Sequence, residues 1–269
     1  MPTRYLSCSA FFLAICLFYA PLLLPAQSPG PRQPPTAEEL RQMKTRLETE
    51  LINAGSDTAR VRLKMQLAGL ISADNPNGAF DMARDALALA EKTGHTETIA
   101  RSHFGLGNLY LRNNRPEQAL EQFNRGLPLA EKTARPDLQE AYYKSLAQIY
   151  FDRGVYEKSL DYYRKSLSML EKMQAPPLRQ ATTLIQIGNL LERTGKNREA
   201  VETFKKALGG LEQARDWGKA GAVWRSIGNC YQALGDTGQA EQAYAKARAY
   251  QDDDKKKAPF PANGRPGNN

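Results

Sequence analysis

Apolar, small and aromatic residues recur along residues 56–250 with a period of about 40 residues. In each of four copies, a small residue is followed by an aromatic ring four positions later and by another small residue three positions after that. Offsets of four and three place all three residues on one face of a helix. In chain order the three sets are Ala119, Ser159, Ala200 and Ala240; Phe123, Tyr163, Phe204 and Tyr244; and Gly126, Ser166, Ala207 and Ala247.

A second helical pattern precedes each of these. Twelve residues before each anchor stands another small residue, which follows a Leu or Ile and precedes a Tyr or Leu by three positions. Each copy therefore predicts a helix hairpin in which the small residue lets the two helices approach closely. These small residues are Gly107, Ala147, Gly188 and Gly228. Repeats of this length are typical of stacked helix hairpins, whose function lies on a binding surface.

A weaker copy comes first. Leu63, Leu67 and Leu70 lie on one predicted helix, and Ala79 and Ala83 lie on the next with Ala86. Ala79 precedes Ala119 by the same 40 residues. We therefore expect five hairpins.

The segments Leu106-Gly107-Asn108-Leu109-Tyr110 and Ile227-Gly228-Asn229-Cys230-Tyr231 resemble the tetratricopeptide repeat. The resemblance implies an all-α, right-handed α-solenoid of about five stacked hairpins, with a weak repeat over 56–95 and four repeats over 96–250. The period exceeds the usual 34 residues of that family. In this it resembles the longer-helix variant found in kinesin light chains and in bacterial peptide-sensing regulators.

Residues 1–26 differ from the rest of the chain because they are mainly apolar and carry Arg4 as their only charge. This composition resembles a secretory signal peptide cleaved near Ala26. Tyr5 to Leu24 is also about long enough to span a bilayer, so an uncleaved anchor is the alternative. We therefore expect an exported protein of bacterial type, in the periplasm or associated with the cell envelope.

The segments that flank the repeats have simpler patterns. Residues 27–35 are rich in proline and predict an extended linker. Thr36 and Glu39 form a capping-box pattern, and an apolar stripe follows, so we expect a capping helix over 36–54 that covers the first repeat. Residues 251–269 lose apolar periodicity and predict a disordered tail. Because no further polar-faced helix follows, the last repeat is a candidate surface for self-association.

The net charge of +8 at first suggests nucleic acid. However, Lys and Arg alternate with Glu in segments such as 199–206, which is typical of solvated helix faces. We therefore expect no nucleic-acid partner. Attraction to an acidic partner, or a peripheral association with an anionic envelope, remains compatible with the charge.

Reactive residues are too sparse for a known catalytic pattern. The sequence contains no His-Glu-x-x-His, Gly-x-Ser-x-Gly or Cys-x-x-Cys. Gly195 and its counterparts Gly154 and Gly235 predict hairpin turns. His103 aligns with large residues of other repeats and Cys230 lies in a helix of the core, so we expect both to pack. We predict no enzyme, no cofactor and no metal site.

The resemblance places the first helix of every hairpin on the concave side. One residue after each small residue stands a carboxamide, which can donate and accept hydrogen bonds with an extended peptide. Lys144 and Arg225 each lie four residues before such a carboxamide, an arrangement that resembles half of a carboxylate clamp. Phe104 and Ile185 stand at the equivalent positions, so we expect a groove that is partly apolar. The candidate residues for peptide binding are Asn108, Arg112, Lys144, Gln148, Asn189, Arg193, Arg225 and Asn229.

From these residues we expect a non-enzymatic scaffold that binds a peptide or protein segment in the concave groove, outside the cytoplasm. The alternative is a sensor or regulatory subunit that acts through a separate partner chain. A third interpretation is that the carboxamides bond within their own hairpins and the cations only solubilise the surface.

Overall fold

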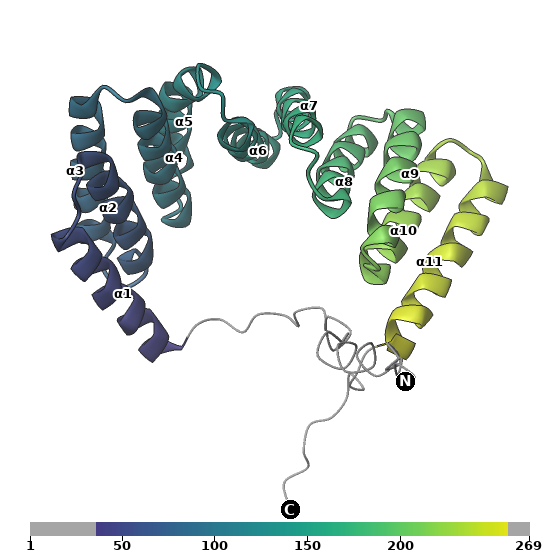
Figure 1. Ribbon diagram of the computed structural model, residues 1–269. Coiled ribbons are helices and arrows are strands. Elements are labelled where there is room, and N and C mark those ends of the chain that lie inside the picture. Colours follow the sequence, from purple (N-terminus) through teal and green to yellow (C-terminus); the bar gives the residue numbers. More distant parts are fainter. Residues whose placement is uncertain (1–35, 258–269) are drawn as a thin grey trace, which may run out of the picture. The chain divides into compact units, whose positions relative to one another are not determined.

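All regular structure in residues 36–257, the part of the chain that the computed structural model describes, is helical. The helices follow one another as antiparallel neighbours (Figure 1). Their bounds are α1 Ala37–Ile52, α2 Asp57–Ile71, α3 Pro76–Thr93, α4 Thr96–Arg112, α5 Pro116–Glu131, α6 Pro136–Asp152, α7 Tyr156–Lys172, α8 Pro177–Arg193, α9 Asn197–Gln213, α10 Trp217–Ala233 and α11 Thr237–Lys257. The predicted all-α fold is confirmed.

Two compact units divide the chain, residues 1–43 and residues 44–269, and the division falls within α1. The predicted capping box begins this helix: the Glu39 amide donates to Thr36 Oγ1 at 3.2 Å, and the Thr36 amide donates to Glu39 Oε2 at 2.7 Å. These bonds satisfy free amides at the helix start. No residue of α1 is buried, and Leu40 and Met43 are exposed. Coverage of the first repeat by α1 stays a prediction.

Helices α2–α11 form five hairpins. Each of the last four turns has three residues, at 113–115, 153–155, 194–196 and 234–236, whereas the turn between α2 and α3 has four, at 72–75. Gly154, Gly195 and Gly235 have φ angles of 72°, 74° and 79°, as predicted from their places in the sequence. Glycine occupies this left-handed region without the steric penalty that a Cβ brings.

The interior of each hairpin brings the repeated small residue against the repeated ring. A Cβ added at Gly107 would lie 2.5 Å from Phe123 Cε1, and one added at Gly228 would lie 2.5 Å from Tyr244 Cε1. Gly188 meets Phe204 in the same way. Phe123 and Phe204 are fully buried. The absence of a side chain on the first helix is therefore what allows the ring of the second helix to pack against it.

Neighbouring hairpins are joined mainly by a second helix that packs on the next first helix. Tyr142 of α6 is fully buried, and its hydroxyl donates to the Ala100 carbonyl oxygen of α4 at 2.5 Å. Gly126 of α5 leaves room for this hydroxyl, because a Cβ there would overlap it. First helices also contact each other directly, α2 with α4 and α8 with α10. We call the exposed side of α2, α4, α6, α8 and α10 the first-helix face.

The two ends of the described region differ from each other. Helix α11 continues to Lys257, past residue 250, where we expected the tail to begin. Backbone hydrogen bonds propagate a helix once it is nucleated, so its last turns do not need an apolar face. The signal-like segment 1–26, the linker 27–35 and residues 258–269 lie outside the described residues.

Candidate functional site on the first-helix face

A row of carboxamides occupies equivalent positions on four first helices. These are Asn108 on α4, Gln148 on α6, Asn189 on α8 and Asn229 on α10. Gln148 and Asn229 are exposed, and Asn108 and Asn189 are half-buried. The structure therefore places all four on the surface of the predicted helices, but it gives them two different environments.

Gln148 and Asn229 hydrogen-bond within their own hairpins. The Tyr163 hydroxyl donates to Gln148 Oε1 at 3.0 Å, and the Tyr244 hydroxyl donates to Asn229 Oδ1 at 2.9 Å. Gln148 Nε2 also donates to Asp152 Oδ1 at 2.8 Å. These two side chains hold the ends of core rings, and Asn229 also hydrogen-bonds Glu192 of the preceding hairpin.

Asn108 and Asn189 have no such partner. Among the described residues, none hydrogen-bonds their side chains. Each carboxamide retains two donors and an acceptor for a ligand backbone. These two asparagines are consequently the members of the row that remain available for binding.

The predicted cations divide in the same way. Arg112 Nη1 donates to the Gly69 carbonyl oxygen at 3.2 Å, and the Arg193 guanidinium lies 5.1 Å from the ring centroid of Phe151. Lys144 and Arg225 are exposed, and within residues 36–257 neither forms an ion pair or hydrogen bond. Arg112 and Arg193 therefore join neighbouring repeats, whereas Lys144 and Arg225 are free to meet an anionic ligand.

One carboxylate on this face, that of Glu192, has a raised pKa. Burial raises the pKa of Glu192, while a hydrogen bond from Asn229 and the nearby Arg193 charge act in the opposite direction. Desolvation disfavours the charged form of a carboxylate, which accounts for the direction. Glu192 is half-buried, whereas Lys144 and Arg225 are exposed.

The first repeat contributes no carboxamide to the row. The buried pair Leu67 and Ala68 matches the buried pair Leu106 and Gly107, so Ala68, and not Leu67, occupies the place of Gly107. Gly69 then stands where Asn108 stands in the next repeat, and Met65 where Phe104 stands. This correspondence places Ala68 eleven residues before Ala79, one fewer than the twelve that separate Gly107 from Ala119.

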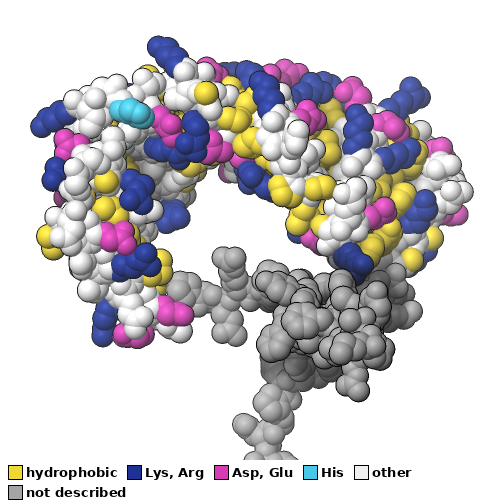
Figure 2. Space-filling model, viewed as in Figure 1, with side chains coloured by type: hydrophobic (Ala, Val, Ile, Leu, Met, Phe, Trp, Pro, Cys, Tyr) yellow, Lys and Arg dark blue, Asp and Glu magenta, His cyan; other side chains and the backbone are white. Residues whose placement is uncertain are grey.

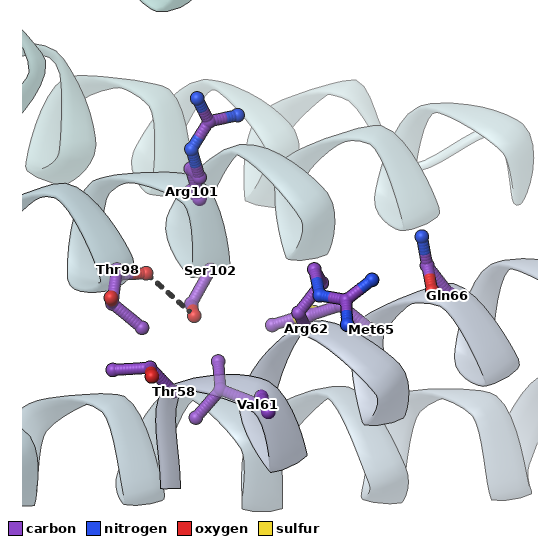
Figure 3. Close-up of a pocket in the computed structure, with 9 residues that line it drawn as sticks. Thr58, Val61, Arg62, Met65, Gln66, Thr98, Arg101 and Ser102 are labelled. Atoms are coloured by element: carbon purple, nitrogen blue, oxygen red, sulfur yellow. Dashed lines mark hydrogen bonds between the residues drawn. The ribbon is translucent and has the colours of Figure 1, made fainter. Parts of the chain in front are cut away.

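Sequence reasoning missed a depression between α2 and α4 of about 430 Å³. In Figure 3, Val61, Arg62 and Met65 of α2 face Thr98 and Ser102 of α4 across the open space. The full lining is Thr58, Ala59, Val61, Arg62, Met65, Gln66, Thr98, Arg101 and Ser102. The place of Ser102 is taken by Tyr142, Thr183 and Val223 in the later repeats, so the repeat pattern alone could not indicate the depression.

Beside this depression lies a network of four charges. The Glu97 carboxylate accepts from Arg101 and Arg135 at 2.8 Å each, and Asp137 accepts from Arg135 at 2.9 Å. The hydrogen bond from Arg135 lowers the pKa of Asp137. On the face drawn in Figure 2, basic and acidic side chains are interspersed. This intermixed distribution agrees with the one expected from the sequence.

The remaining chemistry-bearing groups have packing roles. His103 is buried, with Nδ1 3.0 Å from Gln122 Oε1, and His95 Nδ1 accepts from the Thr98 amide at the start of α4. Cys230 is fully buried, and burial raises its pKa to about 12. The described residues include no cluster of three or more His, Cys, Asp or Glu side chains that could hold a metal ion.

With this geometry established, comparison with known families identifies the class of the protein. The tetratricopeptide repeat family model matches residues 65–132, 137–213 and 179–253. The chain belongs to the tetratricopeptide repeat family, whose fold is that of a protein-interaction scaffold. Its sequence matches no curated protein sequence.

Solved structures with the same fold come from distant proteins. BtubC (BKLC) from P. vanneervenii aligns with a TM-score of 0.68 and 19% identity, covering 87% of this chain and 98% of that one. A putative kinesin light chain from Podosopora anserina with TPR-like repeats aligns with a TM-score of 0.60 and 19% identity, covering 77% and 100%. A STAND protein with a tetratricopeptide repeat sensor from Pyrococcus horikoshii aligns with a TM-score of 0.68 and 15% identity, covering 83% and 35%. At these identities the likeness shows the fold alone.

The helices were also compared with the length of a membrane span. None of those described within residues 36–257 is both long and apolar enough to cross a bilayer.

Proposed function

We propose that this protein is a non-enzymatic scaffold that binds an extended peptide or protein segment along its first-helix face. The observation that carries this proposal is the set of polar groups on that face without partners among the described residues. Asn108 and Asn189 offer hydrogen bonds to a backbone, and Lys144 and Arg225 offer charge to acidic side chains or a C-terminal carboxylate.

The spacing of these groups supports a ligand in extended conformation. They lie on four successive first helices, α4, α6, α8 and α10, so no compact ligand touches all of them at once. Binding by an extended segment would combine several weak contacts, each roughly 0.5–1.5 kcal/mol for a neutral hydrogen bond. Neighbouring apolar side chains such as Phe104 and Ile185 would add burial to these polar contacts.

The binding experiment compares two variants that lose equal charge. In the face variant, Asn108, Lys144, Asn189 and Arg225 are all replaced by Ala. In the control, three exposed residues on second helices, Asn124, Arg198 and Lys206, are replaced by Ala. The two proteins and the parent are tagged and used to capture partners from the native cell envelope, after circular dichroism has shown equal helicity.

We expect the parent and the control to retain the same partner and the face variant to lose it. Equal retention by all three proteins would contradict the role of the first-helix face. Retention of a kinase or DNA-binding chain would favour the alternative of a regulatory subunit. Substitution of Tyr244 and Lys246, followed by mass measurement, tests self-association through the last repeat.

We further propose that the protein acts outside the cytoplasm, in the periplasm or at the envelope. The proposal is supported by the signal-like composition of residues 1–26. The test is the N-terminal sequence of the protein purified from its native host. A mature terminus near residue 27 in the periplasmic fraction is the expected result, and an intact Met1 in the cytoplasmic fraction would overturn it.

A further inference from the structure

We infer that the depression between α2 and α4 binds one large apolar side chain of the captured peptide, next to a carboxylate on that peptide. This inference rests on the proposed function, because it names what one part of the first-helix face recognises. It concerns residues that the carboxamide row does not include.

The depression exists because one repeat junction lacks a ring that the next junction has. Tyr142 of α6 packs against Phe104 of α4, with ring centroids 5.1 Å apart. Ser102, forty residues before Tyr142, takes the place of that ring, and Met65, thirty-nine residues before Phe104, takes the place of the other. The junction between α2 and α4 therefore contains no aromatic side chain where the following junction contains two.

The residue that receives the ring also differs between the two junctions. Gly126 admits the Tyr142 hydroxyl in the following junction, whereas the equivalent residue in the first repeat is Ala86, which is fully buried. Ala86 packs with Val61 and Ala90 in a small core cluster. The residues that line the depression all come from α2 and α4, so it lies on the first-helix face.

The surface of the depression favours an apolar occupant. Val61 is buried and Met65 is half-buried, and both belong to the same core cluster. The polar atoms of α4 are already bonded: Ser102 Oγ donates to the Thr98 carbonyl oxygen at 2.9 Å, and Thr98 Oγ1 lies 2.9 Å from His95 Nδ1. At about 430 Å³ the depression falls within the range of roughly 300–1,000 Å³ typical of ligand sites.

The charge at the rim indicates the neighbour of that side chain. Arg101 is already neutralised by Glu97 and Asp137, at 2.8 and 3.6 Å. Arg62 is exposed, and no ion pair or hydrogen bond joins it to another described residue. A carboxylate beside the apolar side chain would supply Arg62 with the partner that the chain does not.

The experiment follows the Met65 ε-methyl group by NMR in the full chain labelled with ¹³C-methyl methionine. The probe is the blocked peptide acetyl-Gly-Phe-Glu-Gly-amide, and the comparison peptide has alanine in place of phenylalanine. A ring placed in the depression shifts the Met65 signal, which the Met65→Leu variant assigns. We expect a saturable shift with the first peptide and at least about tenfold weaker binding of the second, from the lost apolar burial.

Matched substitutions locate the effect. Ala59→Trp fills the depression, whereas Ala88→Trp adds the same side chain at an exposed alanine on α3. Only the first variant should abolish the shift. Arg62→Gln should weaken binding about two- to fivefold, as for an exposed ion pair, and Arg60→Gln, on the same helix outside the lining, should leave it unchanged.

The inference is overturned if the phenylalanine peptide leaves the Met65 signal unmoved, or if both peptides shift it equally. A shift that depends on protein concentration alone would identify a second copy of this chain as the occupant and would also overturn it. A failure here leaves partner capture by Asn108, Lys144, Asn189 and Arg225 unaffected. Loss of the proposed function would instead appear as equal capture by the face variant.

Discussion

The interior of the hairpins and the first-helix face are built on the same helices but follow different rules. Inside, a glycine meets a ring in three of the five hairpins, and Ala147 replaces the glycine in the hairpin of α6 and α7. On the face, the position three residues before that small residue changes in chemistry from one repeat to the next. It holds Met65, Phe104, Lys144, Ile185 and Arg225 in turn.

This difference separates what folds the chain from what it recognises. Close packing restricts the interior to a few residue combinations, because adding or removing even one methylene there changes stability. Solvent imposes no such restriction on the face. The repeated positions therefore establish the architecture. The positions that vary are the ones that can determine which ligand binds.

The largest expected effect of breaking the interior is at Phe123. This ring is fully buried against Gly107, so Phe123→Ala should lower the free energy of unfolding by about 3–5 kcal/mol. Urea unfolding followed by circular dichroism measures the change. Arg225→Ala on the first-helix face is the control, with an expected change within about 0.5 kcal/mol. Equal midpoints for the two variants would contradict the division between interior and face.

Alkaline pH should also lower the free energy of unfolding, because it ionises tyrosines that are buried in the interior. Burial raises the pKa of Tyr163 to about 12, with the Asp152 charge as a smaller cause. The unfolded chain loses this proton near pH 10, before the folded chain does. The stability contribution of the neutral hydroxyl is thus present below pH 10 and is lost as the pH rises toward 12, by about 2 kcal/mol in total.

Urea midpoints measured from pH 8 to pH 11 test this direction. Burial raises the pKa of Tyr142 and Tyr143 as well, so the fall in stability should begin near pH 10 and exceed the share of Tyr163 alone. Tyr163→Phe should make the fall shallower. A slope unchanged by this variant would mean that Tyr163 titrates normally in the folded protein.

Two helix glycines, Gly107 in α4 and Gly209 in α9, compare close packing with open space. Gly107→Ala places a Cβ 2.5 Å from the Phe123 ring, and we expect a loss of about 1–3 kcal/mol. Gly209→Ala in α9 meets no atom within 4 Å and should gain up to about 1 kcal/mol from helix propensity. Thermal unfolding of both variants measures the signs. A gain at Gly107 would show that the hairpin opens without cost.

Much of the fold could be predicted because the packing rule is local and repeated. The offsets among Gly107, Ala119 and Phe123 recur with little change, and the structure realises them as hairpins. The prediction was weaker at the ends, where repetition stops. Helix α11 extends to Lys257 without an apolar pattern, and in the first repeat Ala68 stands eleven, not twelve, residues before its anchor Ala79.

The candidate site could be predicted only in part, for a physical reason. Sequence spacing places Asn108, Gln148, Asn189 and Asn229 at one helical position, but their availability depends on hydrogen bonds from other helices. Tyr163 engages Gln148 and Tyr244 engages Asn229, and such pairings require the distances between helices. The depression beside Met65 depends on the absence of an aromatic ring between α2 and α4. A motif within one helix cannot reveal such an absence.

The smallest expected effects distinguish the two kinds of carboxamide. Gln148→Ala removes the acceptor of the Tyr163 hydroxyl and should lower the free energy of unfolding by about 1 kcal/mol. Asn108→Ala removes no hydrogen bond within the described residues and should change stability by no more than about 0.5 kcal/mol. Urea unfolding of both variants resolves this difference if the midpoints are measured side by side.

Partner binding should show the opposite order, because Asn108 is free to bind a ligand and Gln148 is already engaged. Loss of binding by Asn108→Ala with unchanged stability would place Asn108 in the site. An equal loss of stability in both variants would instead show that Asn108 supports its own hairpin. In that case the candidate binding residues would be reduced to Asn189, Lys144 and Arg225. The carboxamide at position 108 would then support folding, as the interior residues do.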